Sequence, residues 1–292
     1  MSIRKLLLPL TGTSAGEAAL MMALSIARDW GAHVLALHVR VDSRDVAPLA
    51  GEGLSGAMIE EMMSATDAES LTRATAVRAL FEATVAAQGV PVGDPGPVPH
   101  GGTRGPTASF ATVTGREEDL VAQQARLADL TVVPHPEASD DVSSSEALHA
   151  VLFDSGRPVL IAPPKAPGPL GRRICLAWNG TAESASAVYA MLPWLPRAEA
   201  VRILTAEEYQ RRGPAAQDLA AYLALHDVPA EVATFRPIDR EVGAGLLAAA
   251  GEFGADMLCM GAYSHSRLRQ LLLGGVTRHV LEHAALPVLM NR

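Results

Sequence analysis

The stretch that decides the fold runs from Asp256 to Thr277 and reads DMLCMGAYSHSRLRQLLLGGVT. Its first five residues form an apolar run that leads directly into Gly261, and the pair Gly274-Gly275 precedes a helical pattern. A helix that begins behind such a turn presents unpaired backbone N–H groups and the positive end of its dipole, which suits a phosphate. The stretch therefore predicts a strand, a loop and a helix, with a candidate anion site at the turn.

The chain contains this organisation twice. The first strand of each half leads into a glycine turn and an alanine-rich helix, as KLLLPLTGTS (5–14) and RICLAWNGT (173–181). Later segments also correspond, since ADLTVV (128–133) matches ADMLCM (255–260) and RPVLIA (157–162) matches LPVLM (286–290). A proline-rich linker at 163–171 separates the two halves, because such a segment cannot continue a sheet.

Strands and helices alternate most clearly in the second half. Such alternation, with continuous apolar strands, predicts a parallel sheet covered by helices on both faces. Ligands of these sheets bind beyond the carboxyl ends of the strands, where Asn179-Gly180 and Gly261 are expected to meet. The expected strands are 174–178, 200–205, 230–235, 257–260 and 287–290, and the expected helices are 182–192, 217–226, 242–253 and 276–284.

The first half differs by a long additional segment at 42–110. Within it, residues 54–88 have apolar positions at helical spacing and predict one long helix, whereas the Gly- and Pro-rich residues 89–106 predict a loop. The fourth strand of this half runs into Pro134-His135-Pro136-Glu137, which has no glycine. Because prolines lack N–H donors and acidic groups repel phosphate, we expect no nucleotide site in this half.

Composition limits the classes of function. The chain has 292 residues, enough for two domains, and its net charge of −8 argues against a nucleic-acid partner. The apolar run at the N-terminus stops at Pro9, and the next apolar stretch, 18–27, is too short to span a bilayer. We therefore expect a cytoplasmic protein without a membrane partner, with Cys175 and Cys259 as buried free thiols.

These segments together resemble the universal stress protein family in its tandem form. The resemblance lies in Trp178-Asn179-Gly180-Thr181, in Gly261 to Leu268, in Gly274-Gly275-Val276-Thr277 and in Pro287-Val-Leu. It implies two α/β domains, at 1–163 and 171–292, each with a five-stranded parallel sheet of order 3-2-1-4-5 and helices on both faces. It also implies pairing through the last strand, either within the chain or in a homodimer.

ATP-binding members of that family carry G-x2-G-x9-G-[S/T], with an acidic residue after the first strand. Here the pattern falls on Gly261, Ser264, Gly274 and Gly275, so Ser264 and Gly275 depart from it, and Asn179 replaces the acid. A side chain at Ser264 can obstruct close phosphate approach. The resemblance implies ATP with magnesium in the second half, held by Asn179, Gly180, Thr205, Gly261, Ser264, Arg267, Gly274, Gly275, Val276 and Thr277.

Roles within this set follow from chemistry and from the resemblance. The N–H groups of Gly274, Gly275 and Val276 would hold phosphates, Asn179 and Gly180 would lie near the ribose or base, and Thr205 near the adenine. Arg267 is either a phosphate clamp or part of a solvated basic face. No catalytic residue and no metal site is expected, so the leading hypothesis is a stress-response binding or signalling module. A nucleotide-independent scaffold and a weak ATP hydrolase are the alternatives.

Overall fold

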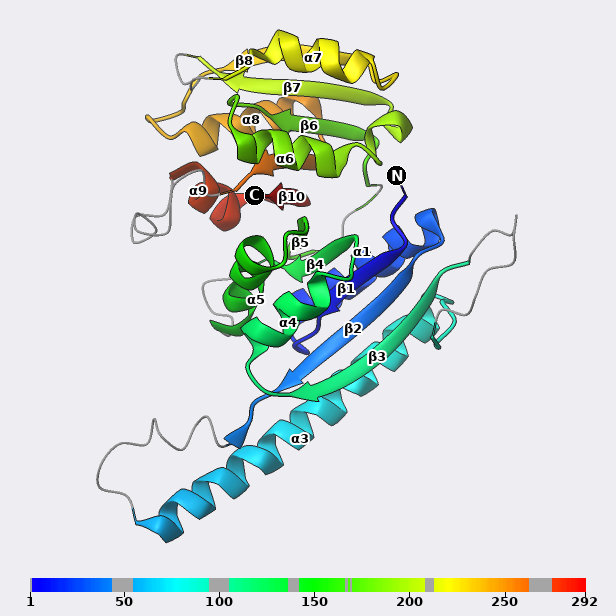
Figure 1. Cartoon of the computed structure of the whole chain (residues 1–292), viewed down its shortest axis with the longest axis vertical. Helices are drawn as coiled ribbons and strands as arrows, with labels where there is room; N and C mark the ends of the chain where they lie inside the picture. The colour runs from blue at the N-terminus through cyan, green and yellow to red at the C-terminus, as the bar shows by residue number, and fades with distance from the viewer. Residues whose placement is uncertain are drawn as a thin grey trace.

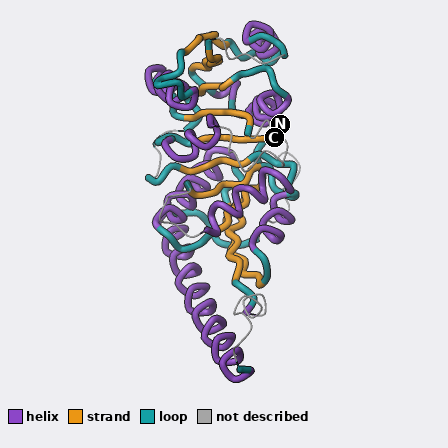
Figure 2. The backbone as a smooth tube through the Cα atoms, turned by 90° about the vertical axis from the view of Figure 1, so that its left-hand side faces the viewer, coloured by secondary structure: helices purple, strands orange, loops and turns teal. Residues whose placement is uncertain are grey.

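The computed structural model describes residues 2–43, 55–94, 105–135, 142–165, 168, 170–207, 213–262 and 275–292. Within these residues one ten-stranded sheet runs the length of the molecule, with helices on both of its faces (Figures 1 and 2). The strand order is β3-β2-β1-β4-β5-β10-β9-β6-β7-β8. Each half therefore has the order 3-2-1-4-5, which confirms the predicted fold class.

The helices and strands follow one another in the same sequence in both halves. The first half consists of β1 (Lys5–Pro9), α1 (Ser14–Trp30), β2 (His33–Arg40), α3 (Gly56–Ala87), β3 (Thr107–Thr114), α4 (Glu117–Ala125), β4 (Leu130–Pro134), α5 (Val142–Asp154) and β5 (Val159–Ala162). The second half consists of β6 (Arg173–Ala177), α6 (Ala182–Met191), a 3-10 turn (Leu195–Arg197), β7 (Ala200–Ala206), α7 (Ala216–Ala224), β8 (Ala230–Phe235), α8 (Val242–Phe253), β9 (Met257–Gly261), α9 (Gly275–His283) and β10 (Val288–Asn291).

The two halves meet at their last strands. β5 and β10 pair antiparallel, with Ile161 opposite Val288 and Val159 opposite Met290, whereas the neighbouring strands within each half pair in parallel. The side chains along this junction are almost completely buried. The pairing through the last strand, which the sequence left open between one chain and two, thus occurs within the chain.

Two apolar layers lie on opposite faces of the sheet. Helices α1, α3, α6 and α7 cover one layer. In this layer the buried side chains of Leu6 and Leu8 from β1, and of Ile174 and Leu176 from β6, pack beneath the helices. Helices α4, α5, α8 and α9 cover the other layer, which includes Leu7 and Cys175. Each layer extends across both halves, because alternate residues of a strand point to opposite faces.

Helix α3 occupies the same place in its half as α7 does in the other. It has 32 residues where α7 has nine, so the predicted additional segment is largely an extension of an existing helix, and β3 begins within that segment at Thr107. Its last turns pack on the sheet through Val77, Phe81 and Val85. Residues 56–73 contribute no buried side chain, and the start of the helix extends past the sheet (Figure 1). Neither α3 nor another described helix is long and apolar enough to cross a membrane.

Both cysteines are free and buried, as the sequence predicted. Burial raises the pKa of the Cys175 thiol to about 12, and burial likewise raises the pKa of Cys259. Because a thiolate is the reactive form of cysteine, these two side chains behave as small hydrophobic residues.

In each half, the aspartate just before the fourth strand accepts hydrogen bonds from the backbone at the start of the first strand. The Asp256 carboxylate accepts hydrogen bonds from the backbone N–H groups of Gly171, Arg172 and Arg173, at 2.9, 2.9 and 3.1 Å. Asp129 accepts two from Arg4 and Lys5, at 2.8 and 2.9 Å. Burial raises the pKa of Asp256, although the three N–H donors act in the opposite direction. The repeated aspartate is therefore explained by strand alignment.

We expect Asp256→Ala to lower the free energy of unfolding by about 1–3 kcal/mol, because it leaves three N–H donors without their acceptor. Asp256→Asn keeps one acceptor oxygen and should lose less. Denaturant unfolding measures both values, with Glu252→Ala on the exposed surface of α8 as the control. An Asp256→Ala protein as stable as the control would contradict this role.

Candidate functional site

The carboxyl ends of β6, β7 and β9 lie side by side at one edge of the second half. β6 pairs in parallel with β9, with Ala177 opposite Met260, so the segments that follow both strands leave the sheet together. The N–H of Trp178 donates to the carbonyl of Leu204 at 2.8 Å, which places Thr205 at the same edge. Four of the predicted site residues are thereby brought to this edge: Asn179, Gly180, Thr205 and Gly261.

The turn after β6 is shaped by the side chain of Asn179. Its Oδ1 accepts hydrogen bonds from the N–H and the hydroxyl of Thr181, at 3.2 and 2.9 Å. Gly180 has a φ of 76°, a left-handed conformation that favours glycine, and Thr181 then caps α6. Within the described residues the amide nitrogen of Asn179 makes no hydrogen bond, so this group can donate to a ligand.

The segment before α7 closes over this turn. A Cβ atom added at Gly213 would lie only 2.0 Å from the carbonyl oxygen of Gly180, so the two backbones touch. The indole N–H of Trp178 donates to the carbonyl of Pro214 at 2.9 Å and fixes the approach. Sequence reasoning missed Gly213, although a Gly-Pro pair ahead of a helix is a signal for a constrained turn.

Gly261 is required for packing against α6. A Cβ atom added there would lie 2.5 Å from the backbone nitrogen of Ser184 and 2.6 Å from the carbonyl carbon of Glu183. The end of β9 therefore passes directly against the first turn of α6. The first glycine of the expected phosphate motif has a structural reason to be glycine, independent of any ligand.

The first turn of α9 carries the candidate phosphate donors. Among the described residues, a Cβ atom added at Gly275 would have only the Oε2 atom of Glu241 nearby, at 3.9 Å. Val276 is half-buried, and Thr277 is buried with 6% exposure. The burial of Thr277 favours a packing role for its side chain. The remaining predicted residues, Ser264, Arg267 and Gly274, lie outside the described residues.

Glu241 reaches α9 from a constrained turn at the start of α8. Asp239 and Arg240 have φ values of 50° and 67°, and Ile238 and Glu241 exchange backbone hydrogen bonds at 3.2 and 2.7 Å. Helices α8 and α9 then pack closely, since a Cβ atom at Gly243 would lie 2.6 Å from Cβ of His279. Sequence reasoning missed Glu241. The Gly243-x-Gly245 spacing in a helix was the available signal for close packing there.

No group of three or more His, Cys, Asp or Glu side chains suited to a metal ion occurs among the described residues. What the edge offers instead is a set of neutral hydrogen-bonding groups. The Asn179 amide can donate to a ligand, and the first N–H groups of α9 have no partner within their own helix. Such donors suit a polar or anionic ligand that arrives with its own counter-ion.

We expect Gly261→Ala to lower the free energy of unfolding by about 1–3 kcal/mol, because the new methyl group overlaps the backbone of α6. Gly275→Ala is the matched comparison. Its methyl group would lie no closer than 3.9 Å to any described neighbour, so stability should stay unchanged or rise by up to about 1 kcal/mol. Thermal and denaturant unfolding measure both changes, and equal effects of the two substitutions would contradict the packing role of Gly261.

Comparisons with known proteins agree with the fold described above. Residues 177–292 match the model of the universal stress protein family. The whole fold is similar to that of a universal stress protein from Archaeoglobus fulgidus, with a TM-score of 0.64 at 14% identity over 99% of this chain and 98% of that one. A functionally unknown protein from Pseudomonas aeruginosa gives 0.56 at 14% identity, over 99% and 92%. No curated protein matches the sequence.

Proposed function

We propose that this chain, which belongs to the universal stress protein family through residues 177–292, binds one adenine nucleotide in its second half and acts as a stress-response binding or signalling module. The observation that carries the proposal is the meeting of the Asn179-Gly180 turn and Gly261 beyond two adjacent parallel strands. Ligands of doubly wound sheets bind at this position.

The described groups support one direction for the bound nucleotide. The amide of Asn179 and the end of β7 at Thr205 lie on the same side, where they suit the ribose and the base. Gly275 and Val276 begin α9, whose N-terminal N–H groups suit the phosphates. Magnesium would accompany the phosphates and reduce their charge. In this proposal the chain binds the nucleotide, and no step of hydrolysis is assigned to it.

One observation favours the alternative of a nucleotide-independent scaffold. The Glu241 carboxylate lies near the first residue of α9, where it supplies a negative charge to the helix N-terminus without any ligand. Gly261 is also explained by packing alone. Under this alternative, the fold serves as a structural scaffold that contacts other molecules without a nucleotide. Nucleotide titration should then give no signal.

Calorimetric titration with ATP and magnesium tests the proposal. We expect about one site per chain, and we expect Gly275→Asp to weaken binding by at least tenfold, because a carboxylate at the start of α9 repels phosphate. Gly56→Asp, which places the same change at the start of α3, is the matched control. Absence of heat at millimolar ATP, or binding unaffected by Gly275→Asp, would contradict the proposed site.

A second expectation concerns Glu241. Removing its charge by Glu241→Gln should strengthen ATP binding by about fivefold if a phosphate at the start of α9 lies about 4 Å from the carboxylate, because like charges at that distance repel by roughly 1 kcal/mol in water. Glu252→Gln, on the exposed face of the same helix, should leave the affinity unchanged. Weaker binding by the Glu241→Gln protein would mean that Glu241 helps to hold the ligand.

A further inference from the structure

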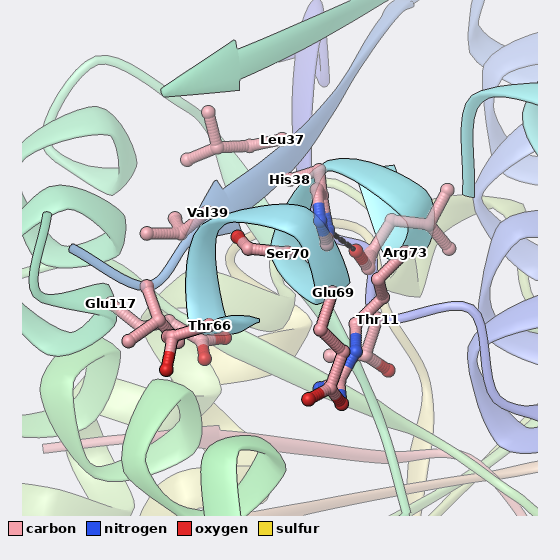
Figure 3. Close-up of a pocket in the computed structure, with 11 residues that line it drawn as sticks. Thr11, Leu37, His38, Val39, Thr66, Glu69, Ser70, Arg73 and Glu117 are labelled. Atoms are coloured by element: carbon pink, nitrogen blue, oxygen red, sulfur yellow. Dashed lines mark hydrogen bonds and ion pairs between the residues drawn. The ribbon is translucent and has the colours of Figure 1, made fainter. Parts of the chain in front are cut away.

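A cavity of about 210 Å³ lies in the first half, between the carboxyl ends of β1 and β2 and the long helix α3 (Figure 3). An apolar cavity of roughly 150 Å³ accommodates benzene, and drug-sized ligands fill roughly 300–1,000 Å³. The volume here therefore suits a molecule with one ring or two fused rings.

One wall of the cavity is specific to the first half. Val77 of α3 packs on the turn after β1, where a Cβ atom at Gly12 would lie 2.8 Å from its Cγ2. Gly213, just before α7, packs in the same way on Gly180. The part of α3 before Val77, which contributes Thr66 and Ser70 to the cavity, thus has no counterpart in the second half. The cavity lies at the same strand edge as the second-half site, since His38 of β2 and Thr205 of β7 take equivalent places, but its wall from α3 is found in the first half alone.

His38 supplies the polar group at the base of the cavity. It lies on β2 with 5% exposure, and its Nδ1 donates to the carbonyl oxygen of Leu10 at 2.9 Å (Figure 3). The Nε2 atom is therefore an acceptor, and it has no protein partner in the part of the chain that the structure describes. Burial lowers the pKa of His38, and Arg73 and Arg40 lower it further, so the ring stays neutral at pH 7.

Thr66 and the two carboxylates of the lining favour a ligand that donates a hydrogen bond and carries no negative charge. The Thr66 hydroxyl donates a hydrogen bond to the carbonyl of Met62 at 2.9 Å. The hydroxyl oxygen can therefore only accept a hydrogen bond from a ligand. Arg73 is paired with Glu69 at 3.2 Å, and Glu117 adds a second carboxylate to the lining. A phosphate would therefore meet two carboxylates and one already paired guanidinium.

We propose that this cavity binds a neutral organic molecule of one or two rings, whose apolar body lies against Leu10, Leu37 and Val39 and whose N–H or O–H group donates to Nε2 of His38. The apolar side chains supply most of the contact, and the Nε2 acceptor of His38 at the base of the cavity selects the orientation. This site is independent of the nucleotide site proposed for the second half.

Indole and 1-methylindole test the proposal on the full chain, because the N-methyl group removes the N–H donor from the same ring system. We expect indole to bind at least tenfold more tightly by calorimetry, and to shift the Nε2 resonance of His38 in nitrogen-15 NMR. His38→Asn retains a donor for the carbonyl of Leu10 but has no acceptor at the position of Nε2, so it should abolish the difference between the two compounds. Circular dichroism confirms that this variant is folded. Equal affinities for the two compounds, or undiminished indole binding by His38→Asn, would overturn the proposal.

A second pair of variants locates the site without altering His38. Thr66→Phe fills the cavity from α3 and should abolish indole binding. Thr72→Phe is the matched control, because Thr72 lies on the same helix, is exposed and makes the same type of hydrogen bond, to Ala68 at 2.9 Å. Indole binding that survives Thr66→Phe, or that ATP displaces competitively, would overturn the proposal. Gly275→Asp should leave indole binding unchanged, which separates this site from the nucleotide site.

Discussion

The antiparallel pairing of β5 with β10 is the interaction on which the rest of the structure depends. Without it, the last strand of each half would be an edge strand exposed to water, although its residues, such as Val159–Ala162, are apolar. Apolar strand edges are prone to unwanted pairing, and joining two of them removes both. The pairing also makes the two apolar layers continuous across the chain. The outer strands β3 and β8 are then the edges that remain.

The repeat explains why the fold could be predicted so closely from the sequence. Apolar strand patterns, glycine turns and linker prolines occur twice in the same order, and each copy supports the reading of the other. Helix α8 was predicted at the residues where it lies, and most other boundaries differ by one or two residues. The place of α3 could not be predicted, because periodicity gives the length of a helix but not its counterpart in the other half.

The candidate site was only partly predictable, since its key contacts join segments that are distant in sequence. Asn179 and Gly261 were recognised because they follow strand ends. The approach of Glu241 to α9 depends on a turn with two left-handed residues, neither of which is glycine, and no local pattern indicates it. For Gly261 the sequence indicated a place in a ligand-binding motif, but it did not indicate the contact with α6 that requires glycine there.

The two halves have used the same edge of the sheet differently. In the second half, glycine backbones approach one another around the turn after β6, and a helix N-terminus faces that region. In the first half, α3 covers the equivalent turn and forms one wall of a cavity that includes His38. A crystal structure of the chain with a non-hydrolysable ATP analogue, magnesium and no other ligand tests this division most directly. The account predicts nucleotide density beside Asn179, Gly261 and the start of α9, and nucleotide density beside His38 instead would contradict it.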